Sequence, residues 1–473
     1  MREPPHIRAA FAPSAWPTVR WVTERVVVIG GDAAGGSAAS QVKRAGGDDV
    51  DVVIVERGRW TSYSACGIPY WIAGDVDKPD DLVARSPDDH RANGIDVRLG
   101  SEAVDLDLDR AVVAVRRPDG ESSELGFDQL MIATGATPVR PDLPGIDSRG
   151  IFGVQTLADG ASIMEALSVE RPLVNAVVVG GGYIGIEMAE AMVRRGLQVT
   201  VLDRAPEPMS TLDPDMGRLV RRAMTGMGID VQHGRVDGFE ADGSGQVRAV
   251  LAGGTEHEAD IVILGLGVRP ETSLADSAGL LLGESGGIRT DSRMQVDGQP
   301  VVFAAGDCVE SFDRVSKSWV HVALGTHANK QGRVAGINLA GGQATFPGIV
   351  RTAVSKVCDL EIARTGLREI DARRAGLSFE VATIGSTTRA GYYPGATLMT
   401  VKMLAEVASG RLLGAQIIGR EGAAKRVDVC AMALWTEMTV HELMQTDLSY
   451  APPFSPVWDP VQVAARVLSG KLR

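Results

Sequence analysis

The residue with the clearest capacity for chemistry is Cys66, in the segment Thr61-Ser-Tyr-Ser-Ala-Cys-Gly-Ile-Pro-Tyr-Trp71. Pro69 favours the first turn of a helix, so Cys66 is expected at the positive N-terminal end of that helix, where the pKa of a thiol is lowered. A thiolate there could attack a disulfide and be regenerated by an electron pair. An isolated cysteine is more often a small buried residue, so the interpretation depends on the neighbouring motifs.

The other cysteines offer no partner for Cys66. Cys308, Cys358 and Cys430 fall in strand or helix patterns and are expected in the core. The four cysteines form neither a Cys-x-x-Cys pair nor a metal-ligand spacing, which predicts no metal site, no disulfide framework and a reducing, cytoplasmic location. Cys66 would therefore form a mixed disulfide with a small thiol of the substrate.

A β-α-β pattern directly precedes this segment. An apolar strand at 25–29 leads into Gly30-Gly-Asp-Ala-Ala-Gly-Gly36, a helix through Arg44, and a strand at 50–55 that ends in Glu56. Such glycines let backbone N–H groups approach phosphates, and the acid can bind a ribose hydroxyl. Asp32 stands where the middle glycine of G-x-G-x-x-G is expected, which weakens the match. The residues predicted to bind a dinucleotide here are Gly30, Gly31, Ala34, Gly35, Glu56 and Arg57.

The pattern recurs between residues 176 and 203. The loop Gly180-Gly-Gly-Tyr-Ile-Gly185 satisfies G-x-G-x-x-G in full, and the following strand ends in Asp203. Two such units make ordinary glycine-rich turns a poor explanation. Asp203 favours NADH because a carboxylate repels a 2′-phosphate, while the adjacent Arg204 leaves NADPH open. The residues predicted to bind this second dinucleotide are Gly180, Gly182, Tyr183, Ile184, Gly185 and Asp203.

Two apolar strands that break into glycine, at 130–138 and 261–270, would let the chain leave the first unit and re-enter it. The segment at 303–308 then supplies an apolar strand that ends in Gly306-Asp307, and the Asp307 carboxylate can accept a hydrogen bond from a flavin ribityl hydroxyl. A helix expected at 327–339 would begin near the flavin. These segments predict FAD on the first unit and a nicotinamide dinucleotide on the second. They add Ala133, Thr134, Gly135, Gly267 and Asp307 to the predicted cofactor-binding residues.

The chain has 473 residues, more than one ordinary core accommodates. We expect an α/β fold of two Rossmann-like dinucleotide-binding domains with an α+β C-terminal domain. The predicted division is a flexible extension at 1–24, an FAD-binding domain at 25–148 and 271–346, an NAD(P)H-binding domain at 149–270, and a dimerisation domain at 347–473. An apolar helix expected at 427–438 suits a dimer interface or a core equally well.

The composition excludes some classes of protein. A net charge of −12 disfavours nucleic-acid binding, which requires lysine and arginine to neutralise phosphates. No apolar run approaches the roughly 18 residues that would span a bilayer, and the first residues lack the apolar centre of a secretion signal. We therefore expect a small-molecule partner and neither nucleic acid nor membrane.

Together these motifs resemble the coenzyme A-disulfide reductase and NADH oxidase branch of the pyridine nucleotide-disulfide oxidoreductases, from about residue 25 onward. The most specific segments are Ser62–Tyr70, the second loop, Ala305–Asp307, Gly391–Gly395 and Tyr450–Ser455. The resemblance implies a glutathione reductase-like fold, FAD with NADH or NADPH, and a homodimer. It also implies that C-terminal tyrosines reach the partner's active site, and Tyr450 with Tyr392 or Tyr393 match that role.

The resemblance further implies a coenzyme A site at Gln41, Arg44 and Ser62, with Arg44 serving a phosphate. Ala65 departs from the asparagine that coenzyme A-disulfide reductases often carry there, so the acceptor stays open between coenzyme A disulfide and a related thiol or persulfide. One alternative is an oxidase that reduces oxygen or peroxide while Cys66 cycles through a sulfenic acid. Another is a redox sensor or interaction protein that binds FAD and NAD(H) without efficient turnover.

Overall fold

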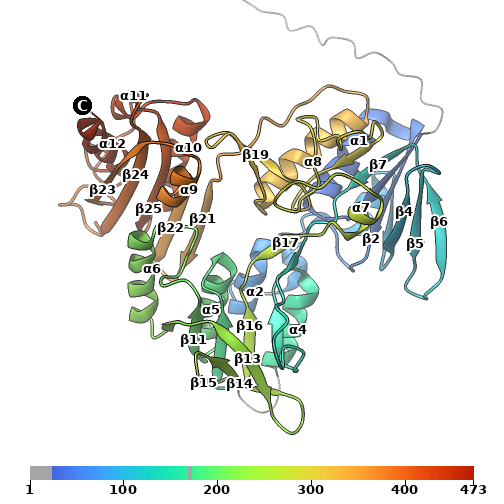
Figure 1. Ribbon diagram of the computed structural model, residues 1–473, viewed down its shortest axis with the longest axis horizontal. Coiled ribbons are helices and arrows are strands. Elements are labelled where there is room, and N and C mark those ends of the chain that lie inside the picture. Colours follow the sequence, from blue (N-terminus) through green and yellow to red (C-terminus); the bar gives the residue numbers. More distant parts are fainter. Residues whose placement is uncertain (1–23, 169–172, 473) are drawn as a thin grey trace, which may run out of the picture.

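A computed structural model describes residues 24–168 and 173–472 (Figure 1). Three five-stranded sheets form its framework, two of them parallel and one antiparallel. The predicted flexible extension, 1–24, lies outside the described residues except for Glu24, which begins the first strand.

The first sheet carries the first glycine-rich loop. Helices α1 (Ala33–Gly46) and α8 (Gly325–Leu339) pack against each other beside it. Their contact requires glycine, because a Cβ added at Gly332 would lie 2.2 Å from the Ala34 carbonyl oxygen. A small antiparallel sheet extends this part of the molecule, with β4 at Glu102–Asp107, β5 at Val112–Arg116 and β6 at Ser122–Gly126. The parallel order is β18-β7-β1-β2-β3, with β18 at Val302–Ala304, β7 at Gln129–Ile132, β1 at Glu24–Ile29, β2 at Val50–Glu56 and β3 at Ile95–Leu99.

The second sheet repeats the arrangement around the second loop. Helix α5 (Tyr183–Arg194) follows the loop, and α6 (Pro214–Gly226) follows the next strand. An antiparallel sheet lies alongside, with β13 at Val236–Ala241, β14 at Val247–Ala252 and β15 at Thr255–Glu258. The parallel order is β12-β11-β10-β16-β9, with β12 at Asp230–His233, β11 at Gln198–Asp203, β10 at Asn175–Val179, β16 at Ile261–Leu264 and β9 at Ile151–Gly153.

The chain passes between the two sheets through one antiparallel pair. Strand β8 (Ala136–Pro138) leaves the first sheet and pairs with β17 (Val268–Pro270), which returns from the second. Strand β18 then joins the first sheet beside β7. The bounds given above for the FAD-binding, NAD(P)H-binding and dimerisation domains remain a prediction.

Helix α2 (Ile68–Ala73) follows the cysteine segment and connects the two parts. Although it comes from the first unit, its apolar side chains are buried with α4 (Leu157–Leu167) and α5. Arg195, just after α5, donates a hydrogen bond to the Ile72 carbonyl oxygen at 2.5 Å. The segment of Cys66 therefore lies where the first unit meets the second.

The third sheet is antiparallel, in the order β21-β22-β25-β24-β23, and forms the orange and red part of Figure 1. Its strands are β21 (Ala353–Val357), β22 (Leu360–Gly366), β25 (Leu412–Gly419), β24 (Leu398–Glu406) and β23 (Phe379–Thr387). Its apolar core includes residues of four helices, α9 (Glu369–Arg374), α10 (Val427–Trp435), α11 (Val440–Met444) and α12 (Pro460–Lys471). Within the described ranges, no helix is both long and apolar enough to cross a membrane.

The predicted helix at 427–438 ends three residues early. Helix α10 stops at Trp435 because Glu437 adopts a φ of 56° and the Met438 N–H closes back on the Ala433 carbonyl oxygen at 2.8 Å. A left-handed residue ends the helical hydrogen-bond pattern. Apolar residues recur at helical spacing past this point, so the predicted helix is longer than the observed one.

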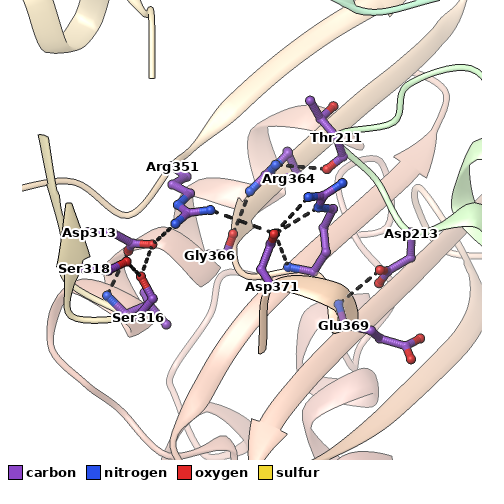
Figure 2. A network of polar contacts seen from close by, with 12 residues as sticks. Thr211, Asp213, Asp313, Ser316, Ser318, Arg351, Arg364, Gly366, Glu369 and Asp371 are labelled. Atoms are coloured by element: carbon purple, nitrogen blue, oxygen red, sulfur yellow. Dashed lines mark hydrogen bonds and ion pairs between the residues drawn. The ribbon is translucent and has the colours of Figure 1, made fainter. Parts of the chain in front are cut away.

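A polar network ties the third sheet to the rest of the molecule (Figure 2). Arg351 pairs with the buried Asp313 at 2.5 Å, in the hairpin of β19 (Ser311–Asp313) and β20 (Ser318–Val320). Arg364 of β22 donates to the carbonyl oxygen of Thr211, which precedes α6, at 2.9 Å. These contacts hold the third sheet against segments that belong to both dinucleotide units.

Candidate active site

The two glycine-rich loops have the same geometry. Gly30 and Gly180 adopt φ values of 97° and 100°, which favour glycine. A Cβ added at Gly35 or at Gly185 would lie 1.9 Å from the carbonyl oxygen of Gly30 or Gly180, respectively. Each helix therefore starts against its strand only because these residues are glycine. The first N–H groups of each helix are left available for a phosphate, as in dinucleotide-binding proteins.

The two acids occupy matching places beside these loops. Glu56 accepts a hydrogen bond from the Gly31 N–H at 2.7 Å, and Asp203 accepts one from the Gly181 N–H at 2.6 Å. The second carboxylate oxygen of each acid accepts from an N–H two residues later, at 2.6 and 2.7 Å. Each loop thus has a carboxylate where the ribose of a dinucleotide would need one.

The other predicted cofactor residues fall around these loops. The Gly30 turn lies against Ala133, since an added Cβ would be 2.2 Å from the Ala133 carbonyl oxygen. Thr134 donates to the Glu271 carbonyl oxygen at 2.6 Å, and Gly267 accepts from the Val139 N–H at 2.9 Å, which fastens the two crossing strands. Gly135 accepts from the Glu271 N–H at 2.9 Å. Ala34 is buried in α1, Gly182 precedes α5, Tyr183 and Ile184 begin it, and Arg57 is exposed.

Asp307 follows β18 and lies close to α8. The preceding Gly306 donates its N–H to the Gln331 side chain of α8 at 3.0 Å, and burial raises the pKa of Asp307. Its charge reaches both Asp32 and Cys66. The structure therefore brings Asp307 toward the first loop and the cysteine, although the three residues are far apart in the sequence.

The prediction of a lowered pKa for Cys66 is wrong. The residue lies in a single 3₁₀ turn, Ala65–Gly67, ahead of α2, and its side chain is accessible to solvent. Desolvation by the surrounding protein raises its pKa, and the carboxylates of Glu187 and Asp307 raise it further. A helix of six residues offsets this poorly, because the partial charge at its N-terminus is small and the nearby carboxylates oppose it.

Glu187 is a site residue that the sequence did not reveal. It lies on α5, burial raises its pKa to about 7, and it accepts a hydrogen bond from the Ser355 hydroxyl of β21 at 2.8 Å. Among the charged groups near Cys66 it has the largest effect. Only the packing of α2 against α5 brings the two together, so no motif near either residue could have shown it.

The predicted substrate residues occupy α1 and the cysteine segment. Arg44 donates to the Gln41 side chain at 3.0 Å, and Arg44 is exposed. The Ser62 hydroxyl faces α1, since a Cβ added at Gly36 would lie 2.4 Å from it. It hydrogen-bonds with the buried His90 at 3.0 Å, and burial lowers the pKa of His90 to about 4. His90 is therefore a neutral partner of Ser62 at physiological pH.

The predicted tyrosines lie in two loops of the third part: Tyr392 and Tyr393 between β23 and β24, and Tyr450 between α11 and α12. Tyr392 and Tyr450 are 78% and 46% exposed, and a hydrogen bond with Tyr392 raises the pKa of Tyr450. Tyr393 is half-buried, and its N–H donates to the Ala390 carbonyl oxygen at 2.8 Å. Two of the three phenols are thus free to meet another surface.

The remaining cysteines differ from one another. Cys308 and Cys430 are fully buried, and burial raises their pKa values to about 11 and about 12. The prediction that Cys358 lies in the core is wrong: it is half-buried with a φ of 48° in the turn between β21 and β22. The sequence pattern did not reveal this turn, because the segments on both sides of it are strands with apolar residues. All four cysteines are unpaired thiols.

Comparisons with known proteins agree with this geometry. The profile described as pyridine nucleotide-disulphide oxidoreductase matches residues 24–332, and the profile of the dimerisation domain of the same family matches residues 352–460. A CoA-dependent NAD(P)H sulfur oxidoreductase from Pyrococcus abyssi is 38% identical over 94% of this chain and 98% of its own length. An NADH oxidase from Methanocaldococcus jannaschii is 35% identical over 95% of this chain and 99% of its own length.

A solved structure shows the same arrangement over most of the chain. The NAD-dependent persulfide reductase from A. fulgidus superposes with a TM-score of 0.91 at 38% identity, covering 94% of this chain and 83% of that one. The predicted α/β fold with two dinucleotide units and a third α+β part is confirmed. The chain therefore belongs to the pyridine nucleotide-disulphide oxidoreductase family, as the resemblance implied, and is an FAD- and NAD(P)H-dependent oxidoreductase.

Proposed function

We propose that this protein reduces a small persulfide or disulfide carried by coenzyme A, using NAD(P)H, FAD and the single thiol of Cys66. The observation that carries this proposal is the place of Cys66: it is accessible to solvent where the first dinucleotide unit meets the second, and it is unpaired. The Pyrococcus abyssi relative is CoA-dependent and acts on sulfur, and the A. fulgidus neighbour is a persulfide reductase.

The residues present fit the two cofactors. The first loop, with Glu56, Ala133–Gly135 and Asp307, would hold FAD, and the second loop, with Asp203, would hold NAD(P)H. When bound, NAD(P)H supplies a hydride and FAD passes the electron pair to sulfur. Asp203 favours NADH over NADPH, because its carboxylate would lie near the 2′-phosphate of NADPH and repel it.

The proposed chemistry at Cys66 needs no second cysteine. Its thiolate attacks the S–S bond of the acceptor, so that one sulfur leaves as a thiolate and the other forms a mixed disulfide with Cys66. Two electrons then break that mixed disulfide, and the second thiol leaves while the Cys66 thiolate is restored. Each turnover takes up one proton beyond the hydride, which Tyr450 of a partner subunit would deliver or help to place.

Gln41, Arg44 and Ser62 are proposed to hold the coenzyme A part of the substrate. Arg44 is an exposed guanidinium on the same helix that the Ser62 hydroxyl faces, and its only hydrogen bond within the described residues is to the Gln41 amide. A guanidinium without a carboxylate partner is well suited to a phosphate. These residues would place the sulfur end of the substrate toward Cys66.

We further propose that the working protein is a homodimer in a reducing cytoplasm. The third part of the chain matches the dimerisation profile and exposes large apolar side chains. Those more than a third exposed there include Met432, Trp435, Phe454, Val457 and Trp458. Sedimentation at micromolar concentration should give twice the chain mass, whereas a monomer would leave Tyr392 and Tyr450 without a role.

The similarity to the Methanocaldococcus jannaschii NADH oxidase keeps a second activity in view. In that case oxygen or peroxide would be the acceptor, and Cys66 would pass through a sulfenic acid. A sensor without efficient turnover is a third candidate, and it requires Cys66 to be inert.

One experiment, run anaerobically and then repeated with oxygen as the acceptor, separates these functions. NADH oxidation at 340 nm is followed with coenzyme A persulfide or coenzyme A disulfide for the parent, for Cys66→Ser and for Cys358→Ser. The proposal predicts turnover in the parent and in Cys358→Ser, whose thiol is also partly accessible, and its loss in Cys66→Ser. Turnover only with oxygen would favour the oxidase, and flavin reduction without turnover by any acceptor would favour the sensor.

A further inference from the structure

Asp32 is the one residue of the first loop that departs from the dinucleotide motif, and the structure shows why it is tolerated. Asp32 has φ and ψ of −91° and −151°, and Gly182, at the matching place in the second loop, has −76° and −168°. Both are extended conformations open to any residue. The middle position therefore does not need glycine for its backbone, and a side chain there can serve another purpose.

The Asp32 side chain binds the segment that carries Cys66. One carboxylate oxygen accepts a hydrogen bond from the Tyr63 N–H at 3.0 Å. The adjacent Ser62 N–H donates to the Gly31 carbonyl oxygen at 3.1 Å, so two successive amides meet two successive residues of the loop. Ser62 itself has a φ of 48°, which marks a sharp turn in the segment.

The second unit contains only half of this arrangement. Its loop also accepts a hydrogen bond from the segment after its acid, from the Met209 N–H to the Gly181 carbonyl oxygen at 2.7 Å. Gly182 has no side chain, so there is no counterpart of the bond from Asp32. The additional contact occurs in the unit whose following segment contains the reactive thiol.

We propose that Asp32 is a positioning residue that fastens the segment of residues 61–66 to the first dinucleotide loop and thereby places Cys66. The inference rests on the proposed function only in taking Cys66 as the reacting group.

The Asp32 carboxyl group can hold the cysteine segment whether it is protonated or ionised. The pKa of Asp32 is raised to about 7: desolvation raises it most, the carboxylates of Glu56 and Asp307 add to this, and the Tyr63 and Ala33 N–H groups lower it. A protonated carboxyl still has a carbonyl oxygen that can accept from the Tyr63 N–H. An ionised Asp32 would in addition oppose ionisation of Cys66.

The experiment compares Asp32→Gly with Asp32→Asn in the flavin-loaded protein. Asp32→Gly reproduces the residue of the second loop and removes the acceptor, while Asp32→Asn keeps an acceptor oxygen and removes the charge. Hydrogen exchange of a peptide covering residues 61–67 is followed by mass spectrometry. We expect roughly tenfold faster exchange at Tyr63 in Asp32→Gly, the effect of one lost hydrogen bond to a charged group, and parental exchange in Asp32→Asn.

Turnover supplies the second readout. In Asp32→Gly the kcat for the acceptor should fall by about tenfold with an unchanged KM for NADH, and Asp32→Asn should restore it. Unchanged exchange at Tyr63 in Asp32→Gly, or equally fast exchange in both variants, would overturn the inference. If Asp32→Gly loses its flavin, Asp32→Asn still decides, because faster exchange at Tyr63 in that variant excludes an oxygen acceptor.

Failure of the inference can be told apart from failure of the proposed function. Cys66→Ser keeps Asp32 and the Tyr63 N–H, so its exchange should equal that of the parent even though its turnover is lost. Parental turnover in Cys66→Ser would refute the function and leave the exchange result intact. Fast exchange in Cys66→Ser would show that the thiol, not Asp32, holds the segment.

Discussion

The two dinucleotide loops are built alike but connected differently to the rest of the molecule. In both, glycine is required at the first and last positions, where a Cβ would lie 2.4 Å or less from a carbonyl oxygen. In both, a carboxylate at the end of the next strand accepts from the second residue of the loop. The middle position is aspartate in one and glycine in the other. A motif position with an extended backbone accepts residues other than glycine, so a side chain there can make contacts of its own.

The surroundings of the loops differ as well. Asp313, in the β19–β20 hairpin, pairs with Arg351, which lies just before the first strand of the third sheet (Figure 2). The second unit is joined to it near the start of α6, where Lys402 of β24 is only 2% exposed and pairs with Asp213, Asp215 and Glu369 at 2.7–3.2 Å. A charge cluster around the buried Lys402 therefore holds the unit predicted to bind NAD(P)H.

The largest expected effect tests that attachment. Lys402→Met leaves three carboxylates around an apolar side chain, and breaking a buried ion pair from one side costs about 3–5 kcal/mol. The free energy of unfolding in urea should fall by that amount. Lys317→Met is the matched control, because its pair with Glu437 is solvent-exposed and contributes about 0–1 kcal/mol. Equal losses in the two variants would mean that the buried cluster does not hold the second unit.

The next effect tests the equivalence of the loops. Gly185→Ala should weaken NADH binding by about 10- to 100-fold, because overpacking costs about 1–3 kcal/mol, while the flavin is retained. Gly35→Ala should instead lower the flavin content of the purified protein. Gly226→Ala in α6 is the control: nothing lies within 4 Å of a Cβ added there, and NADH binding should change by no more than about twofold. Loss of flavin in Gly185→Ala would show that the assignment of the loops is reversed.

The smallest expected effect is a change in the pKa of Cys66, which carboxylates of both units raise. Glu187 follows the second loop and Asp32 belongs to the first; with Asp307 after β18, all three raise the pKa of the thiol, Glu187 the most. Glu187→Gln should therefore lower the pKa of Cys66 more than Asp32→Asn does. Because the pKa of Glu187 is about 7, it is ionised over the alkaline range in which the thiol titrates.

The measurement for this last comparison is the rate of Cys66 alkylation by iodoacetamide as a function of pH, in the absence of NADH. The midpoint should move to lower pH in both variants, and further in Glu187→Gln. An unchanged midpoint in Glu187→Gln would mean that the Glu187 carboxylate does not raise the pKa of Cys66.

Much of the architecture could be predicted because local sequence patterns specify it. The strands ending in Glu56 and Asp203, the glycine loops and the helices that follow them all form at or within two residues of the predicted bounds. These elements depend on short-range requirements, such as the close approach at Gly35 and Gly185. The end of α10 and the turn at Cys358 were missed because a left-handed residue leaves no periodic signal.

The electrostatics of the site could not be predicted in the same way. Local sequence around Cys66 and Pro69 suggested a lowered thiol pKa, whereas Glu187 and Asp307, which are distant in sequence, raise it. Likewise, the sequence showed Asp32 only as a departure from the dinucleotide motif. In the structure its carboxylate accepts a hydrogen bond from the Tyr63 N–H. Both depend on which surfaces pack together.

By itself, the sequence determined the two glycine-rich loops, their acids, the cysteine segment proposed to react and the family, because each rests on residue types at fixed short spacings. Only the tertiary structure decided what surrounds the thiol and how each loop is held. Coulombic effects and side-chain hydrogen bonds depend on distance in space, and the docking of α2 on α5 and of the cysteine segment on Asp32 sets those distances.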